Sequence, residues 1–278
     1  MDLNKDIETL TSLLAGKRIV ALTGAGISTA SGIPDYRGPK TKMKKRSPIQ
    51  YKEFVESAEA RSRYWARSSV GWPKFIQAQP NVSHEALATL EQVGYLRGII
   101  TQNVDRLHQR AGSENVIELH GALDEVRCLN CGKMEERAHL QQRLLELNPG
   151  WDNLPSSYAP DGDADLSPSE TLHYQIPPCQ HCGGMLKPNV VFFGENVARP
   201  IVQDAWELLE DGEVLLVLGS SLTVFSGYRF VREAEKQGKP VIIVNMGETR
   251  GDPHATIKLE HPLQELLPQL VHELLPYA

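Results

Sequence analysis

The run KRIVALTGAG, residues 17–26, decides the fold class, because it joins an apolar segment to a glycine-rich turn. An uninterrupted apolar segment between charged and small residues is typical of a strand that is buried on both faces of a sheet. The following stretch, GAGISTASG (24–32), lies between this segment and an expected helix. The run therefore predicts the first strand and turn of a parallel sheet.

Apolar runs of the same kind recur along the chain and alternate with helix-like stretches. The further runs are YLRGIITQN (95–103), NVIELHG (115–121), NVVFFGE (189–195), VLLVLGSS (214–221) and PVIIVNMG (240–247). The helix-like stretches are 84–94, 198–212 and 226–238. This alternation indicates an α/β fold whose parallel sheet is covered by helices on both faces. We expect ligands at the carboxyl ends of the strands, where parallel sheets bind them.

Two regions interrupt the alternation. From Gly38 to Pro80 the chain is first basic, with KTKMKKR (40–46), and later aromatic, with RYWARSSVGWPKF (63–75). From Leu123 to Pro188 it carries all four cysteines and a loop-rich stretch. We therefore expect two inserted regions in addition to the parallel sheet.

The composition is that of a globular protein, with 278 residues of which 41% are hydrophobic and 23% charged. The formal net charge is −6, so the chain as a whole is not suited to neutralising phosphates, and we expect no nucleic-acid partner. No run approaches the ~20 apolar residues of a membrane span, and the N-terminal stretch lacks the features of a signal or transit peptide. We expect a cytoplasmic monomer, in which the leucine-rich tail 261–278 packs into the core.

The four cysteines form two Cys-x-x-Cys pairs, Cys128/Cys131 and Cys179/Cys182, which are separated by 47 residues. In a reducing compartment this spacing is typical of metal binding rather than of a disulfide framework. Each pair can place two thiolates on one side of a tight turn, and a glycine follows the second cysteine in both pairs. Four cysteines complete a tetrahedral site, so we predict one structural Zn²⁺ with no open position for a substrate.

The glycines of GAGISTASG would let backbone N–H groups approach a pyrophosphate, but the dinucleotide motif is incomplete. Thr29 stands where the third glycine of G-x-G-x-x-G belongs. KTKMKKR also occupies the place of the apolar strand with an acidic end that should follow. A hydride-transferring dehydrogenase is therefore disfavoured. The next segment, GIPDYRG (32–38), is either a plain surface loop or a loop that closes over a nucleotide.

His120 lies between an apolar run and the first cysteine pair, in ELHGALDEVRCLNCG (118–132). Three roles are open to it: metal ligand, core residue or acid/base group. Four cysteines saturate zinc, so the ion does not need this imidazole. An imidazole with an ordinary pKa near ~6.5 suits proton transfer at neutral pH, and Gly121 leaves room for a substrate backbone. His108 is the next candidate base, and we expect it to be structural or solvated instead.

Several blocks together resemble the sirtuins, the NAD-dependent protein-lysine deacylases. They are GAGISTASGIPDYRG, TQNVDRLHQRAG, ELHG, the two cysteine pairs, KPNVVFFGE, GSSLTV and NMGETR, in family order from Lys17 to Arg250. PDYRG, RYWARSSVGWP, LNPGW, APDGD and SGYRF are similar to the class II subgroup that includes mitochondrial sirtuin 4. The long stretch between the cysteine pairs also fits that subgroup.

The resemblance implies a Rossmann-like parallel sheet with helices on both faces, a small zinc-binding module and a helical cofactor-loop region. The Rossmann-like NAD-binding domain would comprise 1–37, 81–122 and 189–278, the cofactor-loop region 38–80 and the zinc-binding domain 123–188. It further implies NAD as co-substrate and an acyl-lysine protein or peptide as substrate.

Roles for individual residues are also implied, motif by motif. Cofactor-binding positions would be Gly24, Ala25, Gly26, Ser28, Asp35, Tyr36, Arg37, Gln102, Asn103, Asp105, Gly219, Ser220, Ser221, Asn245 and Gly247. His120 would be the general base, with Asn103 and Asp105 as the other catalytic positions, around the nicotinamide and its ribose. The substrate peptide would add its backbone along Val191, Phe192, Phe193 and Gly194. The alternative for that segment is a buried core strand, and both can hold for alternating side chains.

The acyl group is the least determined part of the prediction. Tyr64 and Arg67 resemble the pair with which some sirtuins hold a carboxylate-tipped acyl chain, although Arg67 could equally be a helix-surface cation. We expect a preference for longer or acidic acyl groups over acetyl. The stretch 148–169 is either a disordered surface loop or a flap that reaches the acyl channel, and Trp151 and Tyr158 favour partial order.

Two other functions compete with deacylation. One is mono-ADP-ribosyl transfer to protein side chains, which would use the same NAD site. The other is a non-catalytic module that binds NAD and zinc as an interaction partner. The presence of Asn103, Asp105 and His120 argues against the second alternative.

Overall fold

The computed structural model describes residues 2–35, 48–151, 154, 163–164, 166–167 and 171–277. These residues group into two compact units. The first unit takes its described residues from Met1–Lys44, Gln79–Leu119 and Val197–Ala278. The second takes them from Lys45–Ala78 and His120–Asn196.

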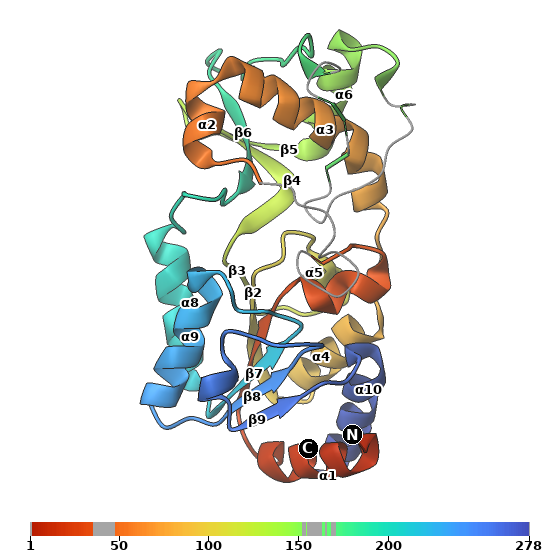
Figure 1. The fold of residues 1–278 in the computed structure, drawn as a ribbon, viewed down its shortest axis with the longest axis vertical. Helices are drawn as coiled ribbons and strands as arrows, with labels where there is room; N and C mark the ends of the chain where they lie inside the picture. The colour runs from red at the N-terminus through yellow and green to blue at the C-terminus, as the bar shows by residue number, and fades with distance from the viewer. Residues whose placement is uncertain are drawn as a thin grey trace. The chain divides into compact units, whose positions relative to one another are not determined.

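The first unit is built on a six-stranded parallel sheet with the order β3-β2-β1-β7-β8-β9 (Figure 1). The strands are β1 (Ile19–Thr23), β2 (Leu96–Thr101), β3 (Val116–Glu118), β7 (Val214–Leu218), β8 (Val241–Val244) and β9 (Ile257–Leu259). The order runs outward in both directions from β1 and β7, which is the Rossmann arrangement and places its switch point between these two strands. The predicted parallel α/β sheet is therefore confirmed.

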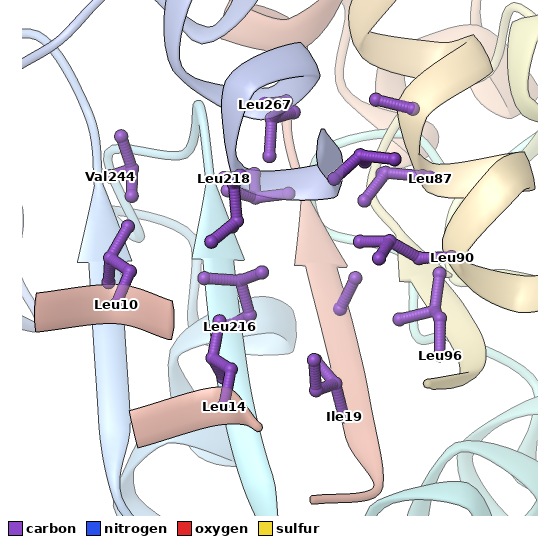
Figure 2. Packing of buried hydrophobic residues seen from close by; sticks show 14 of the residues in the cluster. Leu10, Leu14, Ile19, Leu87, Leu90, Leu96, Leu216, Leu218, Val244 and Leu267 are labelled. Carbon is purple, nitrogen blue, oxygen red and sulfur yellow. The ribbon is translucent and has the colours of Figure 1, made fainter. Parts of the chain in front are cut away.

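Alternate residues of the central strands enter two separate cores. Ile19 and Ala21 belong to a cluster with α1 (Leu3–Leu14), α4 (Val82–Gln92) and α10 (Leu263–Leu274), part of which is drawn in Figure 2. Val20 and Leu22 belong to a second cluster with α8 (Arg199–Asp211) and α9 (Phe225–Lys236). Because successive strand residues point to opposite faces, helices cover both faces of the sheet.

The leucine-rich ends of the chain pack into the first of these cores. Leu10 and Leu14 of α1 are fully buried, as are Leu266, Leu267 and Leu270 of α10. Their spacing of three and four residues places them on one helix face. The prediction that the tail packs into the core is confirmed. Within the described residues, no helix combines the length and the apolar character that crossing a membrane requires.

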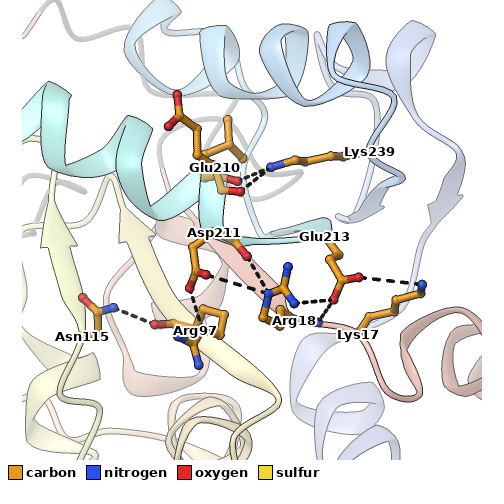
Figure 3. A network of polar contacts seen from close by, with 9 residues as sticks. Lys17, Arg18, Arg97, Asn115, Glu210, Asp211, Glu213 and Lys239 are labelled. Carbon is orange, nitrogen blue, oxygen red and sulfur yellow. Dashed lines mark hydrogen bonds and ion pairs between the residues drawn. The ribbon is translucent and has the colours of Figure 1, made fainter.

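A polar network fixes the start of β1 to the end of α8, away from the carboxyl ends of the strands (Figure 3). The Lys239 ammonium donates to the carbonyls of Leu209 and Glu210, and Arg18 Nε donates to the carbonyl of Asp211 at 2.9 Å. These are among the last carbonyls of α8, which have no partner within the helix. The side chains of the network are largely exposed, so its ion pairs contribute little stability by themselves.

The second unit combines helices with a small antiparallel sheet of order β5-β4-β6. Its elements are α2 (Tyr51–Glu56), α3 (Ala58–Ile76), β4 (Gly121–Cys128), β5 (Met134–Glu136), α6 (Arg137–Leu147) and β6 (Leu186–Val190). An aromatic core that includes Phe54, Trp65 and Phe192 joins α2 and α3 to this sheet. The unit therefore has a core of its own.

The prediction that 189–195 is a further strand of the parallel sheet is wrong. β6 begins earlier, at Leu186, and pairs antiparallel with β4 in the second unit. Beyond Val190 the chain leaves strand geometry, and Phe193 forms only an isolated bridge with Gln50. A continuously apolar run indicates burial on both sides, but it does not identify the sheet to which the strand belongs. The three-part domain division remains a prediction, since the described residues form two units by contact.

The turns that follow β1 and β7 are in direct backbone contact at the switch point. The Gly26 N–H donates to the carbonyl of Gly219 at 2.8 Å, and the Gly24 N–H donates to the carbonyl of Leu218 at 3.1 Å. A Cβ on Gly219 would lie 2.6 Å from the backbone nitrogen of Ile27, and its φ of +62° lies in the left-handed region. Only glycine meets both requirements at Gly219.

Replacing Gly219 with alanine should therefore destabilise the fold by about 2–5 kcal/mol, since the left-handed backbone costs about 1–2 kcal/mol and the overpacking about 1–3 kcal/mol. Gly238→Ala is the matched control, because Gly238 has a φ of +70° but nothing within 4 Å of an added Cβ. It should cost about 1 kcal/mol. Urea unfolding of both variants checks this, and equal losses would contradict the packing argument.

Candidate active site and metal centre

The cofactor-binding positions predicted in the first unit lie at the carboxyl ends of four neighbouring strands. Gly24 follows β1, Gln102 follows β2, Gly219 follows β7 and Asn245 follows β8. The backbone N–H of each of these four residues donates to a carbonyl of a neighbouring strand. For example, the Gln102 N–H donates to the carbonyl of Thr23 in β1 at 3.0 Å. The structure thus brings these positions to the sheet edge where parallel sheets bind ligands.

Side chains link the loops at this edge. Gln102 Nε2 donates to Ser220 Oγ at 2.7 Å, and the same oxygen accepts from the Leu222 N–H at 3.2 Å. Asn245 has a more local role, because its Nδ2 donates to the carbonyls of Met246 and Gly247 at 3.1 Å. Gln102 and Ser220 therefore form one contact across β2 and β7, whereas Asn245 mainly shapes its own turn.

Ser28, Asn103 and Asp105 form a buried polar cluster beside the switch point. Ser28 lies in η1 (Ala25–Ser31), a 3₁₀ helix of seven residues that directly follows Gly24. Its Oγ donates to Asp105 Oδ2 at 2.7 Å and accepts from Asn103 Nδ2 at 3.1 Å. Asn103 Nδ2 also donates to the carbonyl of Gly24 at 3.2 Å. Three of the predicted site residues are therefore brought together.

The cluster defines what each group can offer to a ligand. Both hydrogens of the Asn103 amide nitrogen are used, so the side chain can offer only its oxygen, which is an acceptor for water or a hydroxyl. Asp105 Oδ1 accepts from the Leu107 N–H at 3.0 Å. Burial raises the pKa of Asp105, and hydrogen bonds from Leu107 and Ser28 oppose this shift. Asp105 is thus an oriented and partly buried carboxyl group.

Two buried histidines stand beside the cluster. His84 Nδ1 accepts from the Asn81 N–H at 3.3 Å, and its Nε2 lies 3.5 Å from Ser28 Oγ. His108 Nε2 lies 2.9 Å from Thr23 Oγ1, and the two imidazole rings meet edge to face with centroids 4.9 Å apart. Burial lowers the pKa of His84 to about 4 and that of His108 well below its usual range. Both rings are therefore neutral at physiological pH.

Sequence reasoning missed His84 and treated His108 as either structural or solvated. The structure contradicts the solvated alternative, because the His108 side chain is fully buried. A signal for His84 was present in NVSH (81–84), where an asparagine cap is followed three residues later by a group that can reach back to its N–H. That pattern is a capping box in which imidazole replaces the usual glutamate or glutamine.

The loop GIPDYRG is described only in part. Asp35 is described and follows η1, whereas Tyr36 and Arg37 lie outside the described residues. The choice between a surface loop and a nucleotide-covering loop therefore stays a prediction.

His120 is the first residue of the segment His120–Asn196 of the second unit and lies in the turn between β3 and β4. Its carbonyl accepts from the Val191 N–H at 2.9 Å, and it is partly exposed. The next residue, Gly121, has a φ of +74°, and an added Cβ would collide with the Asn189 carbonyl oxygen. The backbone around His120 is therefore fixed against the segment that follows β6.

The predicted substrate segment has one buried and one exposed aromatic side chain. Phe192 is buried in the aromatic core, whereas Phe193 is 39% exposed. The carbonyl of Phe193 accepts from the Tyr51 N–H at 2.9 Å. The buried ammonium of Lys187 pairs with Glu195 at 3.0 Å, and Glu195 in turn accepts from the Phe192 N–H at 2.9 Å. The segment is thus held in place at both of its ends.

The four cysteines come together into one cluster in the second unit. All four Sγ atoms lie within 4.8 Å of one another, with Cys128–Cys182 at 3.5 Å and Cys131–Cys179 at 3.9 Å. Tetrahedral ligands at about 2.3 Å from zinc would be about 3.8 Å apart, so these separations fit the ion. Gly132 and Gly183 follow the pairs with positive φ, as the sequence predicts.

The thiol chemistry also fits a cation. The backbone N–H of Cys131 lowers the pKa of Cys128 to about 6, which favours the thiolate that a metal binds. A side-chain hydrogen bond with Cys131 is the first cause that raises the pKa of Cys182 to about 12, because it stabilises the protonated Cys182 thiol. A bound divalent ion would take the place of that proton, since a coordinating thiol is deprotonated. His181 is exposed as predicted, and its Nδ1 lies 3.3 Å from the Lys133 ammonium.

His120 is not part of the cysteine cluster. Among the described residues, the metal-capable group contains only the four cysteines. β4 runs from Gly121 to Cys128, and eight extended residues span about 25 Å. The metal-ligand role that was open for His120 is thereby excluded, and the acid/base role remains a prediction.

The structure places Tyr64 and Arg67 on α3, with different surroundings. The Tyr64 ring is buried and packs edge to face against Phe54 and Phe192 with centroids 5.6 and 5.2 Å apart. Arg67 Nε donates to the carbonyl of Ala164 at 3.0 Å, and the Ala164 N–H donates back to the carbonyl of Arg67. Part of the stretch 148–169 therefore packs on α3.

Other parts of that stretch are described unevenly. The Trp151 ring contacts Tyr174 with a centroid distance of 4.6 Å, which supports partial order at that residue. Tyr158 lies outside the described residues. Sequence reasoning missed Arg137, a fully buried guanidinium that lies over the rings of Trp65 and Trp72, with its carbon 5.4 and 5.0 Å from their centroids.

Comparison with known proteins adds to this geometry. The model of the Sir2 family matches residues 24–226. The chain belongs to the Sir2 family. The match begins at the Gly24 turn and contains the buried cluster, His120 and all four cysteines.

Two relatives show how far the Sir2 similarity extends. An NAD-dependent protein deacetylase of Bordetella bronchiseptica is 48% identical over 267 residues, which cover 96% of this chain and 97% of that protein. The mitochondrial NAD-dependent protein lipoamidase sirtuin-4 of Homo sapiens is 47% identical over 271 residues, covering 96% and 86%. The predicted resemblance to sirtuins, including those like sirtuin 4, is confirmed.

Solved Sir2 structures share the fold. A complex of Sir2 with a p53 peptide and NAD⁺ has a TM-score of 0.75 and 33% identity, covering 98% of both chains. Sir2Tm bound to a propionylated peptide also has a TM-score of 0.75 and 33% identity, covering 96% of this chain and 98% of that one. The predicted fold class is confirmed.

The burial of His84 makes the stability of this Sir2 protein depend on pH. Its folded pKa of about 4 lies below the ordinary 6.5, so below pH 6.5 the unfolded chain binds a proton that the folded chain does not. Stability should therefore fall as the pH drops from 6.5 toward 4. Between pH 8 and pH 5 this one group should remove about 2 kcal/mol from the free energy of unfolding.

Urea unfolding at the two pH values measures this loss. Glutamine does not titrate, so the loss should be about 2 kcal/mol smaller in His84→Gln than in the wild type. His272→Gln, which replaces an exposed histidine of α10, should behave as the wild type does. An equal loss in wild type and His84→Gln would show that the folded imidazole titrates normally.

Proposed function

We propose that this chain is an NAD-dependent protein-lysine deacylase that transfers the acyl group of a lysine side chain to ADP-ribose and releases nicotinamide. The observation that carries the proposal is the buried Ser28, Asn103 and Asp105 cluster at the switch point of a Sir2-family Rossmann sheet. The relatives and structures with deacylase names, NAD and acyl-peptides support it.

NAD fits the carboxyl ends of the strands in the first unit. The turns at Gly24–Gly26 and Gly219–Ser221 would hold its phosphates and ribose, with Asn245 and Gly247 on the adenosine side. Asn103 offers an acceptor oxygen, and Asp105 offers a carboxyl group, for the ribose and the amide of nicotinamide. NAD would supply the ribose carbon that receives the acyl oxygen and the nicotinamide that leaves.

We assign the general base to His120. An imidazole can accept the proton of a ribose hydroxyl at neutral pH, and the backbone of His120 is held by the Val191 N–H. The substrate peptide would lie along Val191–Gly194, whose backbone is held by the Lys187 and Glu195 pair. Peptide recognition by an added strand needs such a rigid edge.

Zinc has a structural role in this proposal. Cys128, Cys131, Cys179 and Cys182 supply all four ligands, so no coordination position is left for chemistry. We further propose that the protein acts in the cytoplasm, where thiols stay reduced and available to the ion, and that it works as a transferase. The predicted functional division into an NAD-binding domain, a cofactor-loop region and a zinc-binding domain is part of the same proposal.

Acyl preference is proposed from Tyr64 and Arg67. A guanidinium has five N–H donors, and the contact with Ala164 uses one of them. The remaining donors could hold a carboxylate at the end of an acyl chain. A relative named as a lipoamidase supports activity on groups longer than acetyl. We therefore propose a preference for longer or acidic acyl groups.

Release of free nicotinamide, measured with and without an acyl-lysine peptide, tests the proposed function. Deacylation requires peptide-dependent release, so the rate without peptide should be at background. Peptide-independent release with labelling of protein would indicate mono-ADP-ribosyl transfer, and no release would indicate a binding module.

In His120→Ala, acyl transfer should be abolished while zinc content and the unfolding transition stay unchanged. Full activity in that variant would remove the assignment of the base.

A panel of acyl-lysine peptides tests the acyl preference. Longer and carboxylate-tipped acyl groups should be removed faster than acetyl. Arg67→Met should slow the carboxylate-tipped peptides by about 10-fold through loss of a charge-assisted hydrogen bond, and should leave the uncharged peptides unchanged. Fastest removal of acetyl by the wild type would contradict the preference.

A further inference from the structure

The hydroxyl of Ser28 is the centre of the buried cluster and has three polar neighbours. Asp105 Oδ2 is 2.7 Å away, Asn103 Nδ2 is 3.1 Å away and His84 Nε2 is 3.5 Å away. A serine hydroxyl has one hydrogen to donate and two lone pairs that accept. The Ser28 hydroxyl donates its hydrogen to the Asp105 carboxylate, so Ser28 Oγ must accept the hydrogen bonds from both Asn103 and His84.

That count fixes the protonation of His84. For Ser28 Oγ to accept from it, Nε2 must carry the hydrogen. The other ring nitrogen, Nδ1, accepts from the backbone N–H of Asn81 at 3.3 Å, which requires it to be bare. One neutral tautomer satisfies both contacts. The cap of α4 and the polar cluster thus require the same neutral tautomer of His84, with the hydrogen on Nε2.

We propose that His84 is a positioning residue of the NAD site, which orients the Ser28 hydroxyl and through it the carboxyl group of Asp105 and the amide of Asn103. The inference rests on the proposed function, because it assumes that these groups receive NAD. His84 does not itself touch the cofactor in this account. It acts by donating a hydrogen bond to Ser28 Oγ, so that the hydroxyl hydrogen of Ser28 can point only to Asp105.

The surroundings of His84 support a fixed neutral ring. Its side chain is fully buried, as is that of Ser28. The His108 ring packs against it edge to face, and because two adjacent imidazoles disfavour each other's charge, both stay neutral. The Asn81 side chain cannot replace it at Ser28, since Asn81 Nδ2 donates to the Ile27 carbonyl and to Ser31 Oγ.

The contact lengths set the expected size of the effect. The His84 contact is the longest of the three at Ser28 Oγ, so its loss should weaken the site without destroying it. Loss of one hydrogen bond of this kind corresponds to about 3- to 10-fold in an equilibrium constant. His84→Leu should raise the dissociation constant and the KM for NAD by this factor. The KM for the acyl peptide should change by less than about 2-fold.

A double-mutant cycle separates positioning from a general loss of structure. If His84 acts through Ser28, His84→Leu should have less than about 2-fold further effect on NAD binding once Ser28→Ala is present. His84→Gln should restore binding to within about 2-fold of wild type, because its amide can accept from the Asn81 N–H and donate to Ser28. His272→Gln is the matched surface control.

Calorimetric titration of the full chain with NAD supplies the binding constants, independently of turnover. If His84→Leu does not fold, His84→Asn replaces it, since the shorter amide can serve the cap but does not reach Ser28. Equal factors in both Ser28 backgrounds would overturn the proposal, as would equal damage by glutamine and leucine. Failure of the proposed function would show separately, as absence of peptide-dependent nicotinamide release by the wild type.

Discussion

The contact between the turns after β1 and β7 is the constraint on which the rest of the first unit depends. β1 and β7 pair along their whole length, so their turns begin side by side and must approach without side chains between them. The Gly26 N–H and the Gly219 carbonyl meet this demand with a backbone hydrogen bond of 2.8 Å. Because this contact consumes a backbone donor that a phosphate could have used, the glycines serve close packing as much as ligand approach.

Among the residues that the structure describes, the polar cluster around this contact contains no buried cation. Ser28, Asn103, His84 and His108 are neutral, and Asp105 is the acidic group among them. Burial raises the pKa of Asp105 and lowers the pKa of both imidazoles, so desolvation acts on all three in the direction of less charge. Such a cluster keeps its hydrogen-bond directions over the physiological pH range, since none of its histidines titrates there.

The sequence predicted the parallel sheet and the cysteine cluster well, because periodicity and Cys-x-x-Cys spacing are local signals. It assigned 189–195 to the wrong sheet, since burial of an apolar run does not specify the partner strand. It missed His84, whose importance comes from a contact with Ser28 that spans 56 residues of sequence. The capping box at Asn81 can be recognised in the sequence, but no local pattern shows that Nε2 of His84 lies beside a polar cluster. Tyr36 and Arg37 lie outside the described residues, so their predicted role stays open.

β4 links two features of the second unit that differ in chemistry. It begins at Gly121, directly after the proposed base, and ends at Cys128 in the thiolate cluster. β4 pairs with β5 over Glu125–Arg127 and with β6 over Val126–Cys128, whereas its pairing with β6 is irregular between Gly121 and Val126. The ladder hydrogen bonds therefore stiffen the cysteine end of the strand, and loss of an ion from the thiolates would loosen that end first.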